Sequence, residues 1–450
     1  MSMETGFSSA LNEKALRTPE EVQAWVTAHP GSAVWIIGSG IAGLILAETL
    51  VRHALGVPVV VVTGDPPAEK RMIDGCSLRR STVVALADGM GVPPEQLFSR
   101  FRVEQSAFPK LALHAVDVRA GALQPLSEPI IVGPAPTPGL SGDYPIGLST
   151  RHGEVLLSLR ELVSDRVQLV FARVVSAESS GGSRLSLKFE ASEGEVVLPA
   201  GHALFNTTPQ EGLWKSAKNR TPRPAPRRVI VSQGPVRLKA GVPRVPAAWV
   251  PTWEGSRGPH VAIFTPFWDA GTPEATWYAL NTRVSSAEET DSTAQAEALA
   301  EVREHLQVVM EAYGLEPLDW EQASFDASVP SVRDFDLVSA VDAPYFELYR
   351  VVSSGVPAVN TDGMLAQALG ARRLGLVLAE RHREGWHTAT KVAAQRTKRE
   401  LRPVRWWNAY SVWVYYFAPL WLRRRALGWS TWMLPKMVKD WAFLGLNRVV

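Results

Sequence analysis

The chain carries at residues 34–47 the stretch Val34-Trp35-Ile36-Ile37-Gly38-Ser39-Gly40-Ile41-Ala42-Gly43-Leu44-Ile45-Leu46-Ala47, in which an apolar run leads into Gly-x-Gly-x-x-Gly and an apolar helix follows. In such a turn Gly38 makes the bend, Gly40 lets the backbone approach a pyrophosphate, and Gly43 lets the helix pack on the strand. The helix N-terminus offers free N–H groups and a positive dipole end. We therefore predict a dinucleotide site at Gly38, Ser39, Gly40 and Gly43. The alternative is a tight glycine turn in another kind of α/β protein.

A second strand completes the unit. Residues 57–62 are nearly all β-branched without alternation, which is typical of a strand in a parallel sheet that is buried on both faces. With the predicted helix over 41–54, this strand makes a β-α-β unit. Many such units end the second strand in an Asp or Glu that binds the ribose. Here Thr63 stands at that place and Asp65 follows it, so either residue is a candidate for the ribose contact.

A basic segment follows at residues 69–80 and includes Arg71 and Arg79. Basic side chains directly after the second strand can reach the phosphates of a dinucleotide, and we expect these two arginines to do so. The alternative is a solvated loop face. A helix is predicted next, over residues 81–90.

Composition places the chain among ordinary globular proteins. It has 450 residues, of which 46% are apolar and 20% charged, which is enough for two interleaved domains or three small ones. The single cysteine, Cys76, excludes an intrachain disulfide framework and favours a cytoplasmic location. The nine histidines show no metal-ligand spacing, so we predict no metal site. We expect no secretory signal in residues 1–30, where Thr18 begins a short helix as its N-cap.

The middle of the chain alternates between helix and strand patterns. Residues 106–148 predict strands and turns, and residues 229–284 predict an antiparallel sheet that contains a hairpin. Apolar residues at helical spacing from 299 to 309 predict a helix that ends at Gly314. Between these regions we predict a helix over 151–163 and strands over 167–172, 184–190 and 196–205.

A second candidate cofactor element lies near the end of the globular part. Residues 355–364 read as a strand that ends at Asp362-Gly363, and a strong helix pattern follows over 365–380. In flavoproteins of the two-dinucleotide fold, an Asp at such a helix N-terminus accepts the ribityl hydroxyls of FAD, and the helix points at the flavin. The alternative is an Asp that caps an ordinary helix.

Over residues 30–385 the chain resembles the FAD-dependent monooxygenases related to p-hydroxybenzoate hydroxylase. The stretches 38–47, 78–92 and 361–363 resemble the ADP-binding turn, the helix after the second strand and the Gly-Asp-Ala segment of that family, and Arg151 resembles the Arg that begins its next helix. The resemblance implies an α/β, mixed α+β fold. It divides the chain into a Rossmann-like FAD-binding domain (30–105, 150–210, 350–385), an interleaved antiparallel-sheet substrate domain (106–149, 211–349) and a helical C-terminal segment (386–450).

Two departures from the family pattern concern the electron donor. The family's Asp-Gly motif is replaced by Ala203-Leu204-Phe205-Asn206-Thr207-Thr208-Pro209, which puts direct use of NAD(P)H in question. Residues 61–71 are similar to styrene and indole monooxygenases, which receive reduced FAD from a partner. The resemblance therefore implies FAD as cofactor, with NAD(P)H acting directly or through a partner flavin reductase.

The C-terminal 50 residues are basic and rich in tryptophan. Residues 401–450 hold eight Lys or Arg, one acid and seven of the sixteen Trp. The uncharged run 406–422 would span about 26 Å as a helix, less than the ~30 Å bilayer core. Its aromatic content favours a helix that lies on an anionic membrane surface, peripheral to the inner face. The alternative is an aromatic subdomain that packs on the body.

Together with these patterns, the resemblance implies an FAD-dependent oxidoreductase of secondary metabolism, a monooxygenase that uses a flavin hydroperoxide to oxygenate a lipophilic aromatic or isoprenoid molecule. The alternatives are a non-oxygenating flavoenzyme (dehydrogenase, reductase or redox-neutral cyclase) on a lipid-like substrate, and an NAD-binding or flavin-lacking membrane scaffold. No catalytic side chain and no nucleic-acid partner are predicted. The candidate pocket wall, which could equally be plain core, consists of Phe264, Phe267, Trp268, Trp277 and Tyr278.

Overall fold

The structure is a computed structural model of the whole chain, and it describes part of it. The described residues are 15–54, 56–64, 75–101, 106–119, 122–125, 130–132, 144–145, 147–163, 165–179, 183–208, 228–241, 247–255, 258–267, 277–284, 292–318, 327–328, 345–347, 363–402, 413, 417–419 and 422.

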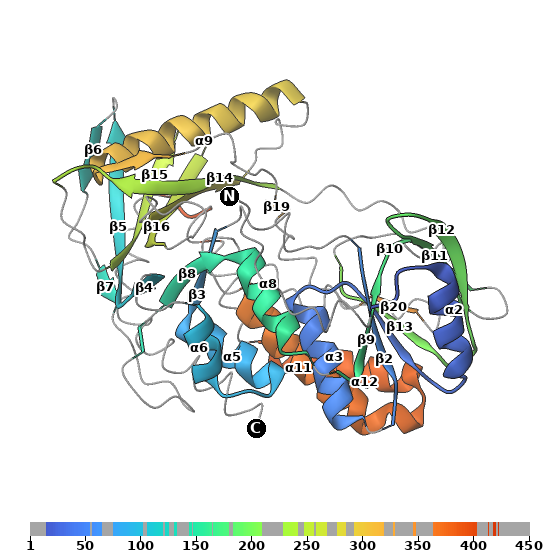
Figure 1. Cartoon of the computed structure of the whole chain (residues 1–450). Coiled ribbons are helices and arrows are strands. Elements are labelled where there is room, and N and C mark those ends of the chain that lie inside the picture. The colour runs from blue at the N-terminus through green and yellow to red at the C-terminus, as the bar shows by residue number, and fades with distance from the viewer. Residues whose placement is uncertain are drawn as a thin grey trace.

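A five-stranded parallel sheet forms the centre of one half of the molecule (Figure 1). Its order is β20 (Tyr345–Glu347), β13 (Ala203–Asn206), β1 (Val34–Ile37), β2 (Val59–Thr63) and β9 (Val167–Phe171), and every adjacent pair is parallel. All residues of β1 and β2 are buried. The uninterrupted apolar runs in the sequence therefore mark strands that are covered on both faces, as predicted.

Helices cover one face of this sheet. Helix α3 (Ile41–His53) packs on β2 and is itself covered by α5 (Arg80–Met90) and α11 (Gly363–Arg381). Residues 41–51 of α3 are all buried, so the helix has no solvent-facing side over three turns. A Cβ on Gly375 of α11 would come within 2.8 Å of Thr49, and the glycine therefore allows the two helices to approach closely.

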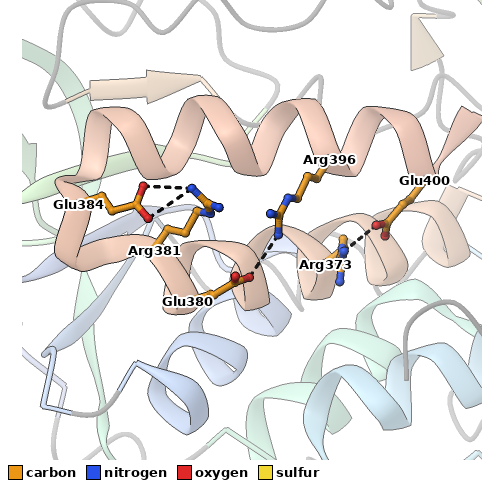
Figure 2. A network of polar contacts seen from close by, with 6 residues as sticks. All are labelled: Arg373, Glu380, Arg381, Glu384, Arg396 and Glu400. Carbon is orange, nitrogen blue, oxygen red and sulfur yellow. Dashed lines mark hydrogen bonds and ion pairs between the residues drawn. The ribbon is translucent and has the colours of Figure 1, made fainter.

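Helices α11 and α12 (Trp386–Glu400) form an antiparallel pair linked by ion pairs, shown in Figure 2. Arg373 contacts Glu400 at 2.6 Å, and Arg396 contacts Glu380 at 3.2 Å. These bridges lie at half-exposed positions, where such pairs contribute up to ~1 kcal/mol each. The apolar seam between the helices, which includes Ala389 and Ala393, remains the main stabilising contact.

The opposite face of the parallel sheet is covered by α2 (Pro19–Ala28) and a three-stranded sheet of β10 (Arg173–Ser179), β11 (Ser183–Lys188) and β12 (Glu193–Leu198). Helix α2 begins with the expected cap, because the Thr18 side chain accepts from the Glu21 N–H and Glu21 reaches back to the Thr18 N–H.

A nine-stranded sheet forms the other half of the molecule, at the upper left of Figure 1. Its strands are β5 (Lys110–Arg119), β6 (Ala122–Pro125), β7 (Ile130–Val132), β14 (Arg228–Leu238), β15 (Ala247–Gly255), β16 (Gly258–Pro266), β17 (Trp277–Val284), β18 (Leu315–Pro317) and β19 (Ala327–Ser328). All pairs are antiparallel except β5 with β15. The long helix α9 (Ser292–Ala312) packs along this sheet.

A small antiparallel sheet lies between the two halves. It contains β3 (Gly75–Arg79), β8 (Gly147–Arg151) and β4 (Ala107–Phe108). Along the chain, helix α6 (Pro94–Arg100) precedes β4, and helix α8 (His152–Glu161) follows β8. Strand β3 leads into α5 and strand β8 leads into α8, and the two strands pair with each other.

The mixed α/β class and most predicted elements agree with the structure, whereas β10 and β20 were not predicted and one predicted strand is wrong. Residues 196–205, predicted as one strand, belong to β12 and β13, which lie in different sheets. Gly201 has φ +104° and turns the chain between them. The hairpin at β16 and β17 is confirmed, with Pro266 opposite Trp277. The proposed strand over 355–362 lies outside the described residues.

Candidate nucleotide-binding site

The glycine turn joins β1 to α3 in a shape that requires its first glycine. Gly38 has φ +106°, and its N–H donates to the Val62 carbonyl at 2.8 Å. A Cβ on Gly38 would stand 2.6 Å from Thr208 Cγ2. Both the backbone conformation and the space therefore exclude a larger residue.

The other two glycines face different surroundings. A Cβ on Gly43 would come within 1.9 Å of the Gly38 carbonyl oxygen, so the first turn of α3 is pressed against the turn that precedes it. A Cβ on Gly40 would meet no described atom within 4 Å. Gly40 is also the N-cap of α3 and has no side chain with which to cap it. The open side of the turn thus lies at Gly40, where the helix N-terminus favours an anion.

Residues at the end of β13 form hydrogen bonds and packing contacts with the glycine turn. Thr207 donates to the Ile37 carbonyl through both its N–H (3.0 Å) and its hydroxyl (2.9 Å). Asn206 Oδ1 accepts from the N–H and the hydroxyl of Thr208, which orders the residue that lies against Gly38. This segment stands where the resembled family has its Asp-Gly motif, and its observed contacts stabilise the glycine turn.

Three polar side chains meet at the ends of β1 and β2. The Ser39 and Thr63 hydroxyl oxygens lie 2.7 Å apart. Arg160 Nη2 donates to Ser39 Oγ at 2.7 Å and to Thr63 Oγ1 at 3.3 Å. Ser39 and Thr63 are 3% and 2% exposed. Burial lowers the pKa of Arg160 to about 10, so the group is still a cation at neutral pH.

Arg160 was not among the site residues predicted from the sequence. It lies in the last turn of α8, 97 residues from Thr63, and the available signal was its place on the helix that Arg151 begins. Asp65, the other candidate for the ribose contact, lies outside the described residues, as do Arg71 and Asp362. Gly363 is the first residue of α11.

Arg79 and Arg151 stand at opposite ends of the pairing between β3 and β8. Arg79 pairs with Gly147, and Arg151 pairs with Gly75. The Arg151 guanidinium carbon lies 5.5 Å from the centre of the Phe267 ring, a cation–π contact, and Arg151 is only 8% exposed. A predicted cofactor residue and a predicted pocket-wall residue therefore meet at the junction of the two halves.

The remaining pocket-wall candidates divide into two groups. Phe264 and Trp277 are buried in the core between the nine-stranded sheet and α9, among Leu306, Val309 and Met310. Trp268 lies outside the described residues, and for Tyr278 only the backbone pairing with Pro235 and Thr265 is described. Phe267 belongs to a separate small cluster with Leu318.

One group in the described part of the chain has the composition of a metal site. The candidate ligand atoms of His260, Glu301 and His305 lie within 4.8 Å of one another. The two imidazoles are stacked, with ring centres 4.5 Å apart and planes 6° apart. A metal that lies in the plane of one ring would be out of the plane of the other, so this geometry does not suit joint coordination.

The hydrogen bonds of these imidazoles support the same conclusion. Trp253 Nε1 donates to His305 Nδ1 at 2.8 Å, and Asn281 Nδ2 lies 3.3 Å from His260 Nδ1. Because an indole N–H can only donate, His305 Nδ1 accepts, and the neutral His305 ring carries its proton on Nε2. Burial lowers the pKa of His260 well below its usual value, and the charge of Arg283 acts in the same direction.

No protein-family model and no curated protein matches this sequence. Solved structures share its fold. A variant of HpxO from Klebsiella pneumoniae, complexed with FAD, has a TM-score of 0.56 and 14% identity over 92% of this chain and 100% of that chain. FqzB has a TM-score of 0.54 and 12% identity over 95% and 96%. Tetracycline destructase Tet(51) has a TM-score of 0.52 and 13% identity over 92% and 98%. These comparisons confirm the fold that the resemblance to FAD-dependent monooxygenases predicts.

Proposed function

We propose that this protein is an FAD-dependent oxidoreductase, a monooxygenase that oxygenates a lipophilic aromatic or isoprenoid molecule. The observation that carries the proposal is the glycine turn with its open side at Gly40, in a chain whose fold is that of FAD-complexed HpxO. HpxO has also been solved in complex with both FAD and uric acid.

In this proposal the glycine turn would hold the adenosine end of FAD. Gly38, Ser39 and Gly40 would hold the pyrophosphate at the N-terminus of α3, where no acid lies in the first turn. Thr63 would meet the ribose at the end of β2. We propose further that Arg71, Arg79 and Arg151 contact FAD and that Asp362 and Gly363 hold its ribityl chain.

Bound FAD would supply the electron transfer and oxygen chemistry, and the chain's own residues would position it and exclude water. Arg151 is nearly buried and contacts the ring of Phe267. A cation is therefore fixed at the boundary between the half that contains the parallel sheet, here called the cofactor half, and the half that contains the nine-stranded sheet. We propose that Phe267 contributes to the wall that a substrate meets. An apolar wall with one fixed cation suits a ring compound with a polar edge.

Two parts of the proposal concern partners. Reduced FAD would come from NAD(P)H, directly or through a partner flavin reductase. The tail 401–450 would contact an anionic membrane surface, which would bring the enzyme to a lipophilic substrate. Among the helices in the described residues, none has the length and apolar character needed to cross a bilayer.

The test begins with the absorbance spectrum of the purified full chain and identification of any cofactor it releases. Bound flavin is expected, and NAD without flavin would refute the proposal. Reduced protein would then be exposed to labelled oxygen with candidate aromatic and isoprenoid compounds. A product that gains one labelled oxygen atom identifies a monooxygenase. A product without added oxygen would identify a dehydrogenase, reductase or cyclase instead.

A further inference from the structure

Arg160 is a partly buried cation for which the described residues provide no carboxylate. Its partners there are two hydroxyl oxygens, on Ser39 and Thr63, and its pKa is lowered by burial. Other arginines near the cofactor half are paired: Arg372 with Asp88 at 2.8 Å and Arg373 with Glu400 at 2.6 Å. A desolvated guanidinium with neutral partners has an unmet preference for an anion.

The surroundings of Arg160 favour a negatively charged ligand. Thr63 occupies the place at the end of β2 where an acid commonly accepts from the ribose, and no acid lies in the first turn of α3. The Thr63 hydroxyl donates to the Gly64 carbonyl at 3.1 Å, so an incoming oxygen would have to replace that bond, whereas Arg160 is already a donor at this place. In dinucleotide-binding folds, an arginine beside the ribose accommodates a phosphate on that sugar.

We propose that Ser39, Thr63 and Arg160 form a phosphate site at the ribose edge of the glycine turn. The site would take an adenine nucleotide that carries a phosphate on its ribose in preference to one with free ribose hydroxyls. FAD has no such phosphate. A ribose-phosphorylated nucleotide would therefore compete with FAD for the turn and regulate how much of the enzyme holds flavin. This inference rests on the proposed function, because it assumes that the turn binds FAD.

The test is competition against FAD on the full chain at constant ionic strength, followed by flavin fluorescence. Adenosine 2′,5′-bisphosphate, adenosine 5′-monophosphate and inorganic phosphate are compared as competitors. The bisphosphate is expected to compete about tenfold more strongly than the monophosphate, which corresponds to ~1.4 kcal/mol. Inorganic phosphate at the same concentration should have little effect. Equal competition by the two nucleotides, or equally strong competition by inorganic phosphate, would overturn the inference.

Variants assign the preference to Arg160. Arg160→Gln should reduce the tenfold ratio to about one, and Arg160→Lys should keep part of it, because the charge remains without the planar fork. Arg184→Gln is the control: this arginine is exposed on β11 and pairs with Glu195. A ratio that persists in Arg160→Gln, or falls equally in Arg184→Gln, would contradict the proposal.

The two proposals fail in different ways. If FAD binds and the bisphosphate shows no advantage, the phosphate site is refuted and the flavoenzyme proposal stands. If neither FAD nor any nucleotide binds to the full chain, both are refuted.

Discussion

Substituting alanine separately at Gly40 and Gly43 should separate the stability of the glycine turn from its ability to bind FAD. At Gly43 an added Cβ would stand 1.9 Å from the Gly38 carbonyl oxygen and 3.0 Å from Thr207 Oγ1. The first contact is with backbone, so the helix or the turn must move. Overpacking of this kind costs ~1–3 kcal/mol. Replacing a helical glycine by alanine returns about 1 kcal/mol. Because the clash is with backbone, we take the upper end of the overpacking cost, ~3 kcal/mol, and subtract the ~1 kcal/mol gained by alanine, so Gly43→Ala should lose about 2 kcal/mol of unfolding free energy.

At Gly40, in contrast, alanine should affect FAD binding more than it affects stability. The added Cβ meets no described protein atom within 4 Å, and the φ of −68° suits alanine. Alanine is a poorer N-cap than glycine, which costs about 0.5–1 kcal/mol. In the proposed FAD complex the methyl group would stand where the pyrophosphate approaches the backbone. Gly40→Ala should therefore weaken FAD binding at least tenfold (~1.4 kcal/mol) with a smaller loss of stability than Gly43→Ala.

The assays are urea unfolding without flavin and FAD titration by fluorescence, with Gly31→Ala as the matched control. Gly31 also has open space where a methyl group would be added, and it lies before β1, away from the turn. The reasoning is refuted if Gly40→Ala binds FAD like the wild type, or if Gly43→Ala unfolds at the same urea concentration as Gly31→Ala.

Three further predictions concern other regions. Burial lowers the pKa of His260 in the folded protein, so below pH 6.5 the unfolded chain binds more protons than the folded one. The stability of the wild type should therefore fall as the pH is lowered from 7 to 5. In thermal unfolding experiments, the melting temperature of His260→Gln should depend less steeply on pH. A double-mutant cycle on Arg373 and Glu400 should give a coupling of up to ~1 kcal/mol, and a value near 3 kcal/mol would mean that the pair behaves as buried. The full chain should float with anionic liposomes and a 1–400 truncation should not, whereas equal flotation would exclude the tail as the membrane contact.

Local patterns in the sequence were sufficient to predict β1, α3 and β2 of the parallel sheet. The strands β1 and β2 are short runs of apolar and β-branched residues, and the alternate residues of each run face different cores: Val34 and Ile36 pack toward α3, whereas Trp35 and Ile37 pack toward α2 and the three-stranded sheet. Such a run has no amphipathic period, and its lack of alternation is the signal for burial on both faces. The capping box at Thr18 is equally local and was found for the same reason.

Contacts between distant segments were not predictable in this way. The hydroxyls of Ser39 and Thr63 could be expected to meet, because both residues lie at the carboxyl ends of adjacent parallel strands. Arg160 joins them only because α8 starts at the end of β8 and runs back toward the parallel sheet, a path set by tertiary packing. The split of 196–205 into two strands was missed because the alternating pattern of β12 and the buried run of β13 are separated only by a short turn that contains Gly201.

The segment at the end of β13, which replaces a motif of the resembled family, has a structural role. The sequence has Asn206-Thr207-Thr208 where the resembled family has Asp-Gly. In the structure Thr207 bonds the carbonyl of Ile37, and Thr208 fills the space beside Gly38. These contacts help to hold the turn in its observed shape. Because a preformed turn loses less conformational entropy when FAD binds to it, the affinity for FAD should depend on Thr207 even though Thr207 need not touch the cofactor.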